Sequence, residues 1–445
     1  MQPTYSAELQ AFATSLQREG VDLYAVGGCV RDALRGTAVH DVDLCSRLQP
    51  KAMQAFCAAR GVLCQSVNPK LGTVLLTLGD AQFEHTTFRT ESYGSGGAHR
   101  PEAVVFADSP KEDAFRRDFC CNALYQNLAT GEIIDPTGGL ADIDDRVLRA
   151  TTPNPADILQ DDGLRVLRLI RFAATLGFSV EPQTEACAKA YAPLLQDIAW
   201  ERKRGELDRL LLADDVYTGL EMLQSFGVLP YVLPELCAAD GMGQRKDHHK
   251  YDVLTHMFHA CAQTPPVLEL RLMALLHDVG KPPCKAAEGN FYAHDIYGAR
   301  IAREMLTRLR YPSATVDRVC AAIRAHMFDL SDAATIATLR KRFCQWGVSR
   351  TQDVIALREA DVRGSGYKLQ FEATRWREVL AAMQRENVPF CGAGLMVTGQ
   401  EIQDALHLPP CERVGRIKQQ LVLHCAVHPA DNVKKTLLLR MHDYQ

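Results

Sequence analysis

The hydrophobic and polar pattern in the first third of the chain predicts short helices and strands that alternate. Residues 5–20 place apolar side chains every three or four positions, as an amphipathic helix does. Residues 23–26 (LYAV) form an apolar run that indicates a buried strand, and residues 30–34 then favour a helix. Residues 41–44 (DVDL) alternate polar and apolar side chains, which predicts a strand with one polar face.

A hairpin is expected next, formed by residues 73–78 and 81–88 around the turn at 79–80. Residues 91–101 are rich in glycine and serine and are expected to form a loop. The first 150 residues therefore predict an α/β domain with a small mixed sheet.

Beyond about residue 155, glycine becomes sparse and the helical period of about 3.6 residues dominates. Helices are expected to continue to the end of the chain, and the clearest segments are 156–175, 182–191, 202–212 and 217–226. Breaks in the pattern suggest domain boundaries near residues 150, 240 and 345. The expected organisation is an α/β head followed by all-α regions, over residues 1–150, 151–240, 241–345 and 346–445.

The composition is that of an ordinary globular protein, with 47% hydrophobic and 23% charged residues. The formal net charge of −4 excludes a chain coated with positive charge, so binding of a polyanion requires a local basic surface. The 15 cysteines include no CxxC pair and lie within apolar runs, which favours reduced core thiols and a cytoplasmic location. No signal peptide or membrane span is expected, because the N-terminus lacks an apolar region and later apolar runs are too short.

Asp41 and Asp43 are the first candidates for metal chemistry. Side chains two positions apart on a strand point to the same side, with Cα atoms roughly 7 Å apart. Two carboxylates completed by substrate phosphates suit Mg²⁺. Upstream, Gly27 and Gly28 permit close approach of the backbone to a ligand, and the helix that follows offers N–H groups and Arg31 to a phosphate. An Asp-x-Asp pair alone is more often a solvated strand edge, so the specificity lies in the order of these features.

That order resembles the head of class II tRNA nucleotidyltransferases (CCA-adding enzymes) and bacterial poly(A) polymerases. The resemblance starts with VGGCVRD at 26–32 and DVDL at 41–44. Further matches follow in the family's order: TTFR at 86–89, RRDF at 116–119, NA at 122–123, DPTGG at 135–139, DDGLR at 161–165 and ERKRGEL at 201–207. It covers roughly residues 20–235 and, more weakly, the remainder. One position departs from the family, whose usual glutamate before Asp162 is Asp161 here. The resemblance implies a polymerase-β-like nucleotidyltransferase head with a helical neck.

The implied reaction is attack of an RNA 3′-hydroxyl on the α-phosphate of a nucleoside triphosphate, with loss of pyrophosphate. Mg²⁺ at Asp41 and Asp43 would stabilise the attacking and leaving oxygens. Glu84, on a candidate strand, is the expected third carboxylate, and its alternative is a solvent-facing position. The residues expected to bind the nucleotide in the head are Gly27, Gly28, Arg31 and Arg117. The alternative for Arg117 is an ion pair with Asp113 or Asp118.

Asp162 and Arg165 are the candidates for choosing the base. One turn apart on the expected helix, they would be neighbours, and a carboxylate accepts a hydrogen bond from an exocyclic amine while a guanidinium donates one. Cytosine and adenine both present an amine beside an acceptor, whereas uracil and guanine reverse this pattern. One such pair could therefore select C and A without a template, which is the role of the matching residues in the family. The alternative is a surface salt bridge. By resemblance Arg168 and Arg171 contact triphosphate or RNA, although a solvated basic face has the same spacing.

A second constellation lies between residues 248 and 330, where the histidines are His248, His249, His256, His277, His294 and His326. LMALLHDVGK at 272–281 resembles the signature of HD-type metal phosphohydrolases, and FYAHD at 291–295 resembles the HD domain of many bacterial CCA-adding enzymes. The resemblance implies a second divalent metal, bound by His256, His277 and Asp278, with Asp329 as a candidate for the last carboxylate. Core packing of the histidines without metal or activity is the alternative.

Residues 396–440 resemble the C-terminal tail that holds the tRNA elbow in this family. A local basic face inside an acidic chain fits phosphate contacts, and the candidate RNA-binding residues are Arg416, Lys418, Lys434 and Lys435. A solvated helix face is the alternative.

The expected function is therefore CCA addition to tRNA from CTP and ATP. A poly(A) polymerase, or an enzyme that adds only A or only CC, is the alternative within the superfamily. An HD phosphohydrolase with a vestigial head, or a non-catalytic RNA-binding protein, would be of another class, and the complete sets of candidate residues argue against both. The pattern gives no indication of the oligomeric state.

Overall fold

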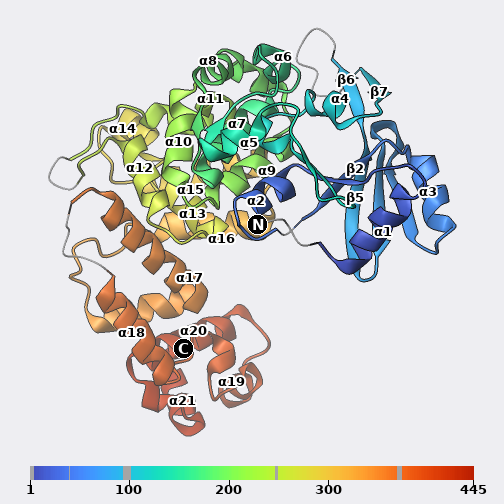
Figure 1. The fold of residues 1–445 in the computed structure, drawn as a ribbon. Helices are drawn as coiled ribbons and strands as arrows, with labels where there is room; N and C mark the ends of the chain where they lie inside the picture. The colour runs from blue at the N-terminus through green and yellow to red at the C-terminus, as the bar shows by residue number, and fades with distance from the viewer. Residues whose placement is uncertain (1–4, 40, 94–101, 246–248, 368–372, 445) are drawn as a thin grey trace. The chain divides into compact units, whose positions relative to one another are not determined.

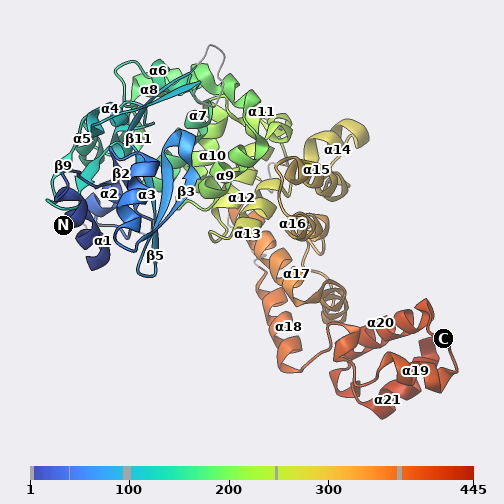
Figure 2. The same cartoon turned by 90° about the vertical axis from the view of Figure 1, so that its right-hand side faces the viewer.

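The computed structural model describes residues 5–39, 41–93, 102–245, 249–367 and 373–444. The chain forms two compact units, Met1–Val232 and Leu233–Gln445 (Figures 1 and 2). Most of the expected loop at 91–101 and His248 lie outside the described residues. Among the described helices, none is long and apolar enough to cross a membrane.

The first unit contains a seven-stranded mixed sheet, as the sequence predicts. Its strand order is β3-β4-β5-β2-β1-β8-β9. Strands β2 and β5 run parallel, whereas the other neighbouring pairs are antiparallel. The strands are β1 (Tyr24–Val26), β2 (Asp43–Ser46), β3 (Leu63–Asn68), β4 (Thr73–Leu78), β5 (Ala81–Thr87), β8 (Tyr125–Asn127) and β9 (Ile133–Ile134).

The two faces of this sheet support different cores. Leu44 of β2 and Phe83 of β5 join a large core with helices α1 (Ala7–Gln17) and α3 (Pro50–Ala58). Cys45, the next residue of β2, lies in a smaller core on the other face. Because side chains alternate along a strand, Asp43 points to the face of Cys45, away from the large core.

The rest of the first unit is mainly helical. Two small ribbons, β6 (Arg89–Ser92) with β7 (Ala103–Phe106) and β10 (Val147–Leu148) with β11 (Ser179–Val180), complete its strands. Its other helices are α2 (Gly28–Leu34), α4 (Pro110–Ala114), α5 (Gly139–Asp144), α6 (Ala156–Leu159), α7 (Leu164–Leu176), α8 (Pro182–Tyr191), α9 (Trp200–Leu211), α10 (Val216–Ser225) and α11 (Leu229–Val232).

The prediction of a single helix over residues 156–175 is wrong, because the helix is interrupted between α6 and α7. Gly163 packs so closely that a Cβ there would lie 2.7 Å from the Leu194 Cβ. The Asp162 carboxylate accepts a hydrogen bond from Leu164 N (3.0 Å), at the start of the new helix. Asp162 therefore precedes the helix that carries Arg165. The three following helices were predicted to within two residues at each end.

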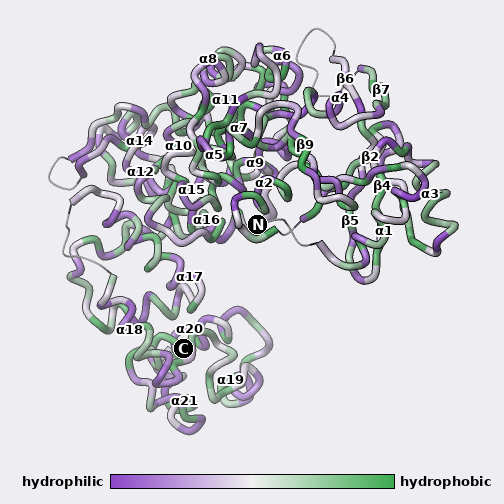
Figure 3. The backbone as a smooth tube through the Cα atoms, viewed as in Figure 1, coloured by the Kyte–Doolittle hydropathy of each residue, from purple (hydrophilic) through white to green (hydrophobic). Residues whose placement is uncertain are grey.

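The second unit is helical throughout its described residues, as predicted. Hydrophobic and hydrophilic stretches alternate along its helices (Figure 3). Helix α17 contains a break at Gly347, whose φ of 79° and ψ of 170° are not helical. The helices are α12 (Val253–Ala262), α13 (Leu268–Leu276), α14 (Lys281–Glu288), α15 (His294–Arg308), α16 (Ser313–Ala325), α17 (Ile336–Gly364), α18 (Thr374–Arg385), α19 (Gly399–Leu406), α20 (Glu412–Val427) and α21 (Lys434–Arg440).

Candidate functional sites

Three acidic residues gather where β2 begins, beside β5 in the middle of the head sheet. The parallel register aligns Leu44 with His85, so Asp43 and Glu84, one residue earlier on each strand, lie side by side. Partial burial raises the pKa of Asp43, an effect that Arg117 opposes and Asp41 reinforces. Burial and the charge of Asp43 raise the pKa of Glu84. Carboxylates that oppose one another's ionisation are a donor set that fits a hard divalent cation.

The glycine turn after β1 brings the backbone close to these carboxylates, because Val26 pairs with Asp43. Gly27 has φ +82° and ψ −132°, a conformation that a side chain would strain, and α2 begins at the next residue, Gly28. A Cβ on Gly27 would lie 3.8 Å from the Arg117 Nη1. The guanidinium of Arg117 therefore lies against the turn and acts on Asp43.

Arg31 is 6% exposed and connects three segments. Its Nε donates to Asp32 Oδ1 (2.8 Å), and its Nη1 donates to the Asn122 side chain. Its guanidinium also lies 5.4 Å from the centroid of the Phe172 ring on α7. These contacts fix α2 against the neck, and the predicted contact of Arg31 with nucleotide stays a prediction.

Asp113 is the buried counter-charge of this site. It is fully buried and lies 2.7 Å from Arg116 Nη2 and 2.8 Å from Arg117 Nη2. The Tyr125 hydroxyl donates to the same carboxylate (2.8 Å). Burial alone would raise the pKa of Asp113, but Arg117 and Arg116 lower it to about 2. Of the two partners considered for Arg117, the structure therefore selects Asp113.

The two residues of the predicted base-selecting pair have different partners in the structure. Asp162 Oδ2 lies 2.6 Å from Arg202 Nη2, on α9. Arg165 is 8% exposed and donates to the carbonyls of Ile158 (2.7 Å) and Arg116 (2.8 Å). A surface salt bridge between Asp162 and Arg165 is thus not formed. The bond to the Arg116 carbonyl places the Arg165 guanidinium next to the residue that precedes Arg117.

Arg168 and Arg171 lie within the neck and do not form a solvated basic face. Arg168 Nη2 lies 2.6 Å from Asp118 Oδ2, and Arg171 Nε lies 2.6 Å from Glu206 Oε2. Arg171 is 9% exposed, and burial lowers its pKa to about 10 although Glu206 opposes the shift. Both arginines therefore hold α7 to its neighbours, and their contact with triphosphate or RNA stays a prediction.

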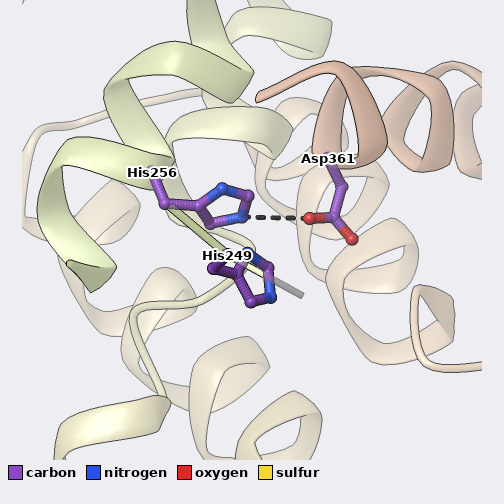
Figure 4. A group of neighbouring side chains, drawn as sticks. All are labelled: His249, His256 and Asp361. Carbon is purple, nitrogen blue, oxygen red and sulfur yellow. Dashed lines mark ion pairs between the residues drawn. The ribbon is translucent and has the colours of Figure 1, made fainter. Parts of the chain in front are cut away.

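The second unit gathers a buried cluster of histidines and carboxylates. His277 and Asp278 follow directly after α13, and His256 on α12 places its Nε2 3.2 Å from His277 Nε2. Asp361, near the end of α17, brings its Oδ1 to 3.0 Å from His256 Nε2 (Figure 4). His249 lies beside this pair, and its Nδ1 is buried without a hydrogen-bond partner. The three predicted ligands His256, His277 and Asp278 are therefore brought together.

The prediction that Asp329 is the last carboxylate of this cluster is wrong. Asp329 lies in the loop after α16, and its carboxylate accepts hydrogen bonds from Ala334 N (2.8 Å) and Trp376 Nε1 (3.3 Å). Asp361 occupies the place instead. Asp361 lies on a helix far along the chain, and no short motif around it predicts this position.

The predicted RNA-binding residues lie on the helices α20 and α21. Arg416 is exposed on α20, and Lys418 lines a cavity of about 420 Å³ with Phe390 and Gly392. On α21, Lys434 and Lys435 are exposed, and Lys434 forms an ion pair with Glu401. Phosphate contacts by these residues stay predictions.

A mixed sheet with adjacent carboxylates behind a glycine turn, followed by a helical neck, defines a nucleotidyltransferase of the polymerase-β-like class. The chain matches the poly(A) polymerase head domain over residues 23–149 and the probable RNA- and SrmB-binding site of that polymerase over 177–240. It matches the HD domain over residues 247–362, a range that includes Asp361 and extends beyond the expected boundary at 345.

Known proteins that are similar to the chain include tRNA nucleotidyltransferases. An A-adding tRNA nucleotidyltransferase of Deinococcus radiodurans is 33% identical over 417 residues, which cover 89% of each chain. A CCA-adding enzyme of Lactiplantibacillus plantarum is 37% identical over 241 residues, which are 53% of this chain and 57% of that enzyme. The crystal structure of the Bacillus stearothermophilus CCA-adding enzyme with CTP superposes with a TM-score of 0.72 at 25% identity, covering 98% of this chain and 96% of that one.

The chain belongs to the family of tRNA nucleotidyltransferases and poly(A) polymerases, and its second unit carries an HD domain. Family membership implies nucleotidyl transfer that depends on a divalent metal.

Proposed function

We propose that this protein adds CMP and AMP to the 3′ end of tRNA to build the CCA terminus, from CTP and ATP. One observation carries the proposal. Arg165 donates to the carbonyl of Arg116, and the adjacent Arg117 acts on Asp43. The candidate for base selection is therefore linked to the candidate metal carboxylates through two consecutive residues, which supports transfer without a template.

The head residues divide the work of transfer. Mg²⁺ would be held by Asp41 and Asp43, with Glu84 beside them, and would supply charge stabilisation to the attacking and leaving oxygens. Gly27 lets the backbone approach the triphosphate, and Arg117 offers a positive charge near Asp43. Asp113 keeps that guanidinium in place.

Base selection would require Asp162 and Arg165 to turn from their present partners to the base. Asp162 would accept a hydrogen bond from the exocyclic amine of cytosine or adenine, and Arg165 would donate to the neighbouring acceptor. Arg202, now paired with Asp162, remains available to orient that carboxylate.

Arg165→Ala is expected to lower the specificity constant kcat/KM for CTP and ATP by at least about tenfold and to raise the share of UMP and GMP incorporated. A site that hydrogen-bonds its substrate loses discrimination when a partner is removed. Single-nucleotide incorporation with each of the four triphosphates measures this. Arg204→Ala, on the neighbouring helix α9, is the matched arginine control and is expected to keep the selectivity. Unchanged discrimination in Arg165→Ala would contradict the assigned role.

A-addition alone is the second candidate, because the relative that aligns over most of both chains is named A-adding. The test uses tRNA lacking CCA, tRNA ending in C and tRNA ending in CC, each with Mg²⁺ and with CTP, ATP or both. Incorporation of CMP twice and then AMP once supports CCA addition. AMP transfer to the CC end alone supports the second candidate, and long A tails on any RNA support a poly(A) polymerase. No incorporation with any substrate contradicts all three.

The remaining proposals concern partners of the other regions. Arg416, Lys418, Lys434 and Lys435 would contact tRNA phosphates, which their charge and the exposure of all but the half-buried Lys418 support. A divalent ion would be bound in the HD domain by His256, His277, Asp278 and Asp361, whose donor atoms converge in a buried cluster.

A further inference from the structure

His85 is a buried polar side chain that the proposed transfer does not use. It follows Glu84 on β5, so it points to the opposite face of the sheet, where the large core lies. Its Nε2 lies 2.8 Å from the Oγ of Ser46 on β2, and both residues are 0% exposed. This hydrogen bond therefore joins the two strands that carry Asp43 and Glu84, on the face away from the carboxylates.

The pair lies in apolar surroundings. Leu44 and Val74 stand opposite His85 on the neighbouring strands β2 and β4, and both belong to the large core. The Nδ1 of His85 is buried without a hydrogen-bond partner, so a proton there would be an unsatisfied donor. The proton therefore lies on Nε2, which donates to the Ser46 Oγ. Separation of the two side chains would leave that N–H unpaired in the core, which is unfavourable.

The register of β2 and β5 is not set by a turn. The two strands run parallel, and α3, β3 and β4 lie between them in the chain. A slip by two residues would keep the same side chains on each face, yet it would move Glu84 by roughly 7 Å relative to Asp43. In the observed register His85 and Ser46 are staggered by two residues along the strands. A slip in either direction would therefore change the distance between them and disturb their hydrogen bond.

Two other contacts join the same strands near their C-terminal ends. Thr87 Oγ1 donates to the carbonyl of Leu48 (2.7 Å), and Phe88 N donates to that of Ser46 (2.9 Å). Of these three contacts, the hydrogen bond of His85 acts nearest to the carboxylates, because His85 is the residue after Glu84.

The geometry points to His85 as a positioning residue for nucleotidyl transfer. Through Ser46 it fixes the register that places Glu84 beside Asp43, and so it fixes the separation of two carboxylates that are proposed to serve one metal site. The rate of such a reaction is sensitive to position, since a misplacement of about 1 Å can cost about a hundredfold. The inference rests on the proposed function, because it concerns the same carboxylates.

A double variant separates positioning from stability. Ser46→Ala with His85→Leu removes both polar partners, so no buried group is left unsatisfied and the melting temperature is expected to stay within about 5 °C of the parent. The kcat for AMP transfer to tRNA ending in CC is nevertheless expected to fall by about ten- to a hundredfold, with the KM for ATP changed by less than about threefold. Loss of structure alone would lower the amount of folded enzyme and leave the kcat of each folded molecule unchanged.

Two single variants complete the comparison. His85→Gln restores a donor on the same strand position and is expected to keep kcat within about threefold of the parent. Tyr5→Phe is the matched control, because it removes a hydrogen bond of equal length (2.8 Å) to Gln126 on β8 of the same sheet and belongs to neither β2 nor β5. It is expected to keep the parental kcat. A parental kcat in the double variant, or equal losses in the double variant and in Tyr5→Phe, would overturn the role of His85.

A cross-link reports the register without an activity assay. Asp43→Cys with Glu84→Cys places two thiols side by side on neighbouring strands, whose spacing of about 4.8 Å lies within the span of a disulfide. Oxidation with diamide is expected to join them, and mass spectrometry of tryptic peptides measures the yield. Adding Ser46→Ala and His85→Leu is expected to lower the yield by at least about threefold, because cysteines whose Cα atoms lie more than about 7 Å apart are not bridged. An unchanged yield would contradict the proposal whatever nucleotide the enzyme transfers, so its failure is distinguished from failure of the proposed function.

Discussion

Asp43→Asn is expected to lower nucleotidyl transfer by at least about a thousandfold, since a catalytic ion supplies several kcal/mol and each 1.36 kcal/mol is tenfold in rate. Asp43 lies beside Glu84 through the β2–β5 register and within the field of Asp41. An amide at this position removes a charge from the group that would hold Mg²⁺. Single-turnover incorporation of labelled AMP into tRNA ending in CC measures the loss.

The matched control is Asp80→Asn, an exposed carboxylate in the turn between β4 and β5. It is expected to keep the parental rate. Circular dichroism of both variants should match the parent, because Asp43 takes no part in the cores of the sheet. A rate within tenfold of the parent for Asp43→Asn would show that the metal is held elsewhere.

Asp113→Ala is expected to destabilise the first unit by about 3–5 kcal/mol, the usual cost of leaving a buried charge without its partner. The variant would strand the guanidinium groups of Arg116 and Arg117 and the hydroxyl of Tyr125. Native-state hydrogen exchange of β2 and β8 measures the effect within this unit. The control Asp108→Ala removes an exposed carboxylate nearby and is expected to change the free energy of unfolding by at most about 0.5 kcal/mol. Equal protection in the two variants would mean that Asp113 is not the counter-charge.

The same carboxylate gives the first unit a defined acid sensitivity. The pKa of Asp113 and that of Asp118 are both lowered to about 2 despite burial, chiefly by Arg117 and Arg168 respectively. An acid with a depressed folded-state pKa contributes stability that is fully present above its unfolded pKa of about 3.9 and is lost as the pH falls toward the folded value. The free energy of unfolding should therefore fall between pH 4 and pH 2, and it should fall less steeply in Asp113→Asn.

The local pattern of the chain predicted those parts of the fold whose cause is local. The hairpin over 73–88 and helix α8 depend on turn residues and periodicity, and both were placed correctly. The break before α7 depends on the contact between Gly163 and Leu194, which no local pattern reveals. For the same reason the partners of Asp162 and Arg165 could not be predicted, since they come from α9 and from the segment after α4.

The site residues show the same division. Asp41, Asp43 and the His277-Asp278 pair stand in short motifs and were predicted directly from them. Glu84 was predicted from its strand, and the parallel register of the structure places it beside Asp43. Asp361 was missed because its neighbours in space, His256 and His277, are remote in sequence.

The contacts between head and neck limit how this protein could be re-engineered or could diverge. Arg165 donates a hydrogen bond to the Arg116 carbonyl. Arg168 forms an ion pair with Asp118, and Arg31 lies against the Phe172 ring. The residues proposed to choose the nucleotide and those proposed to position the metal thus share the same contacts. Replacing the neck with that of a relative of different nucleotide preference would break these contacts, unless residues 116–118 of the same relative were transferred as well. The unit to transfer between relatives is therefore the neck together with the head residues that contact it, and neither domain alone.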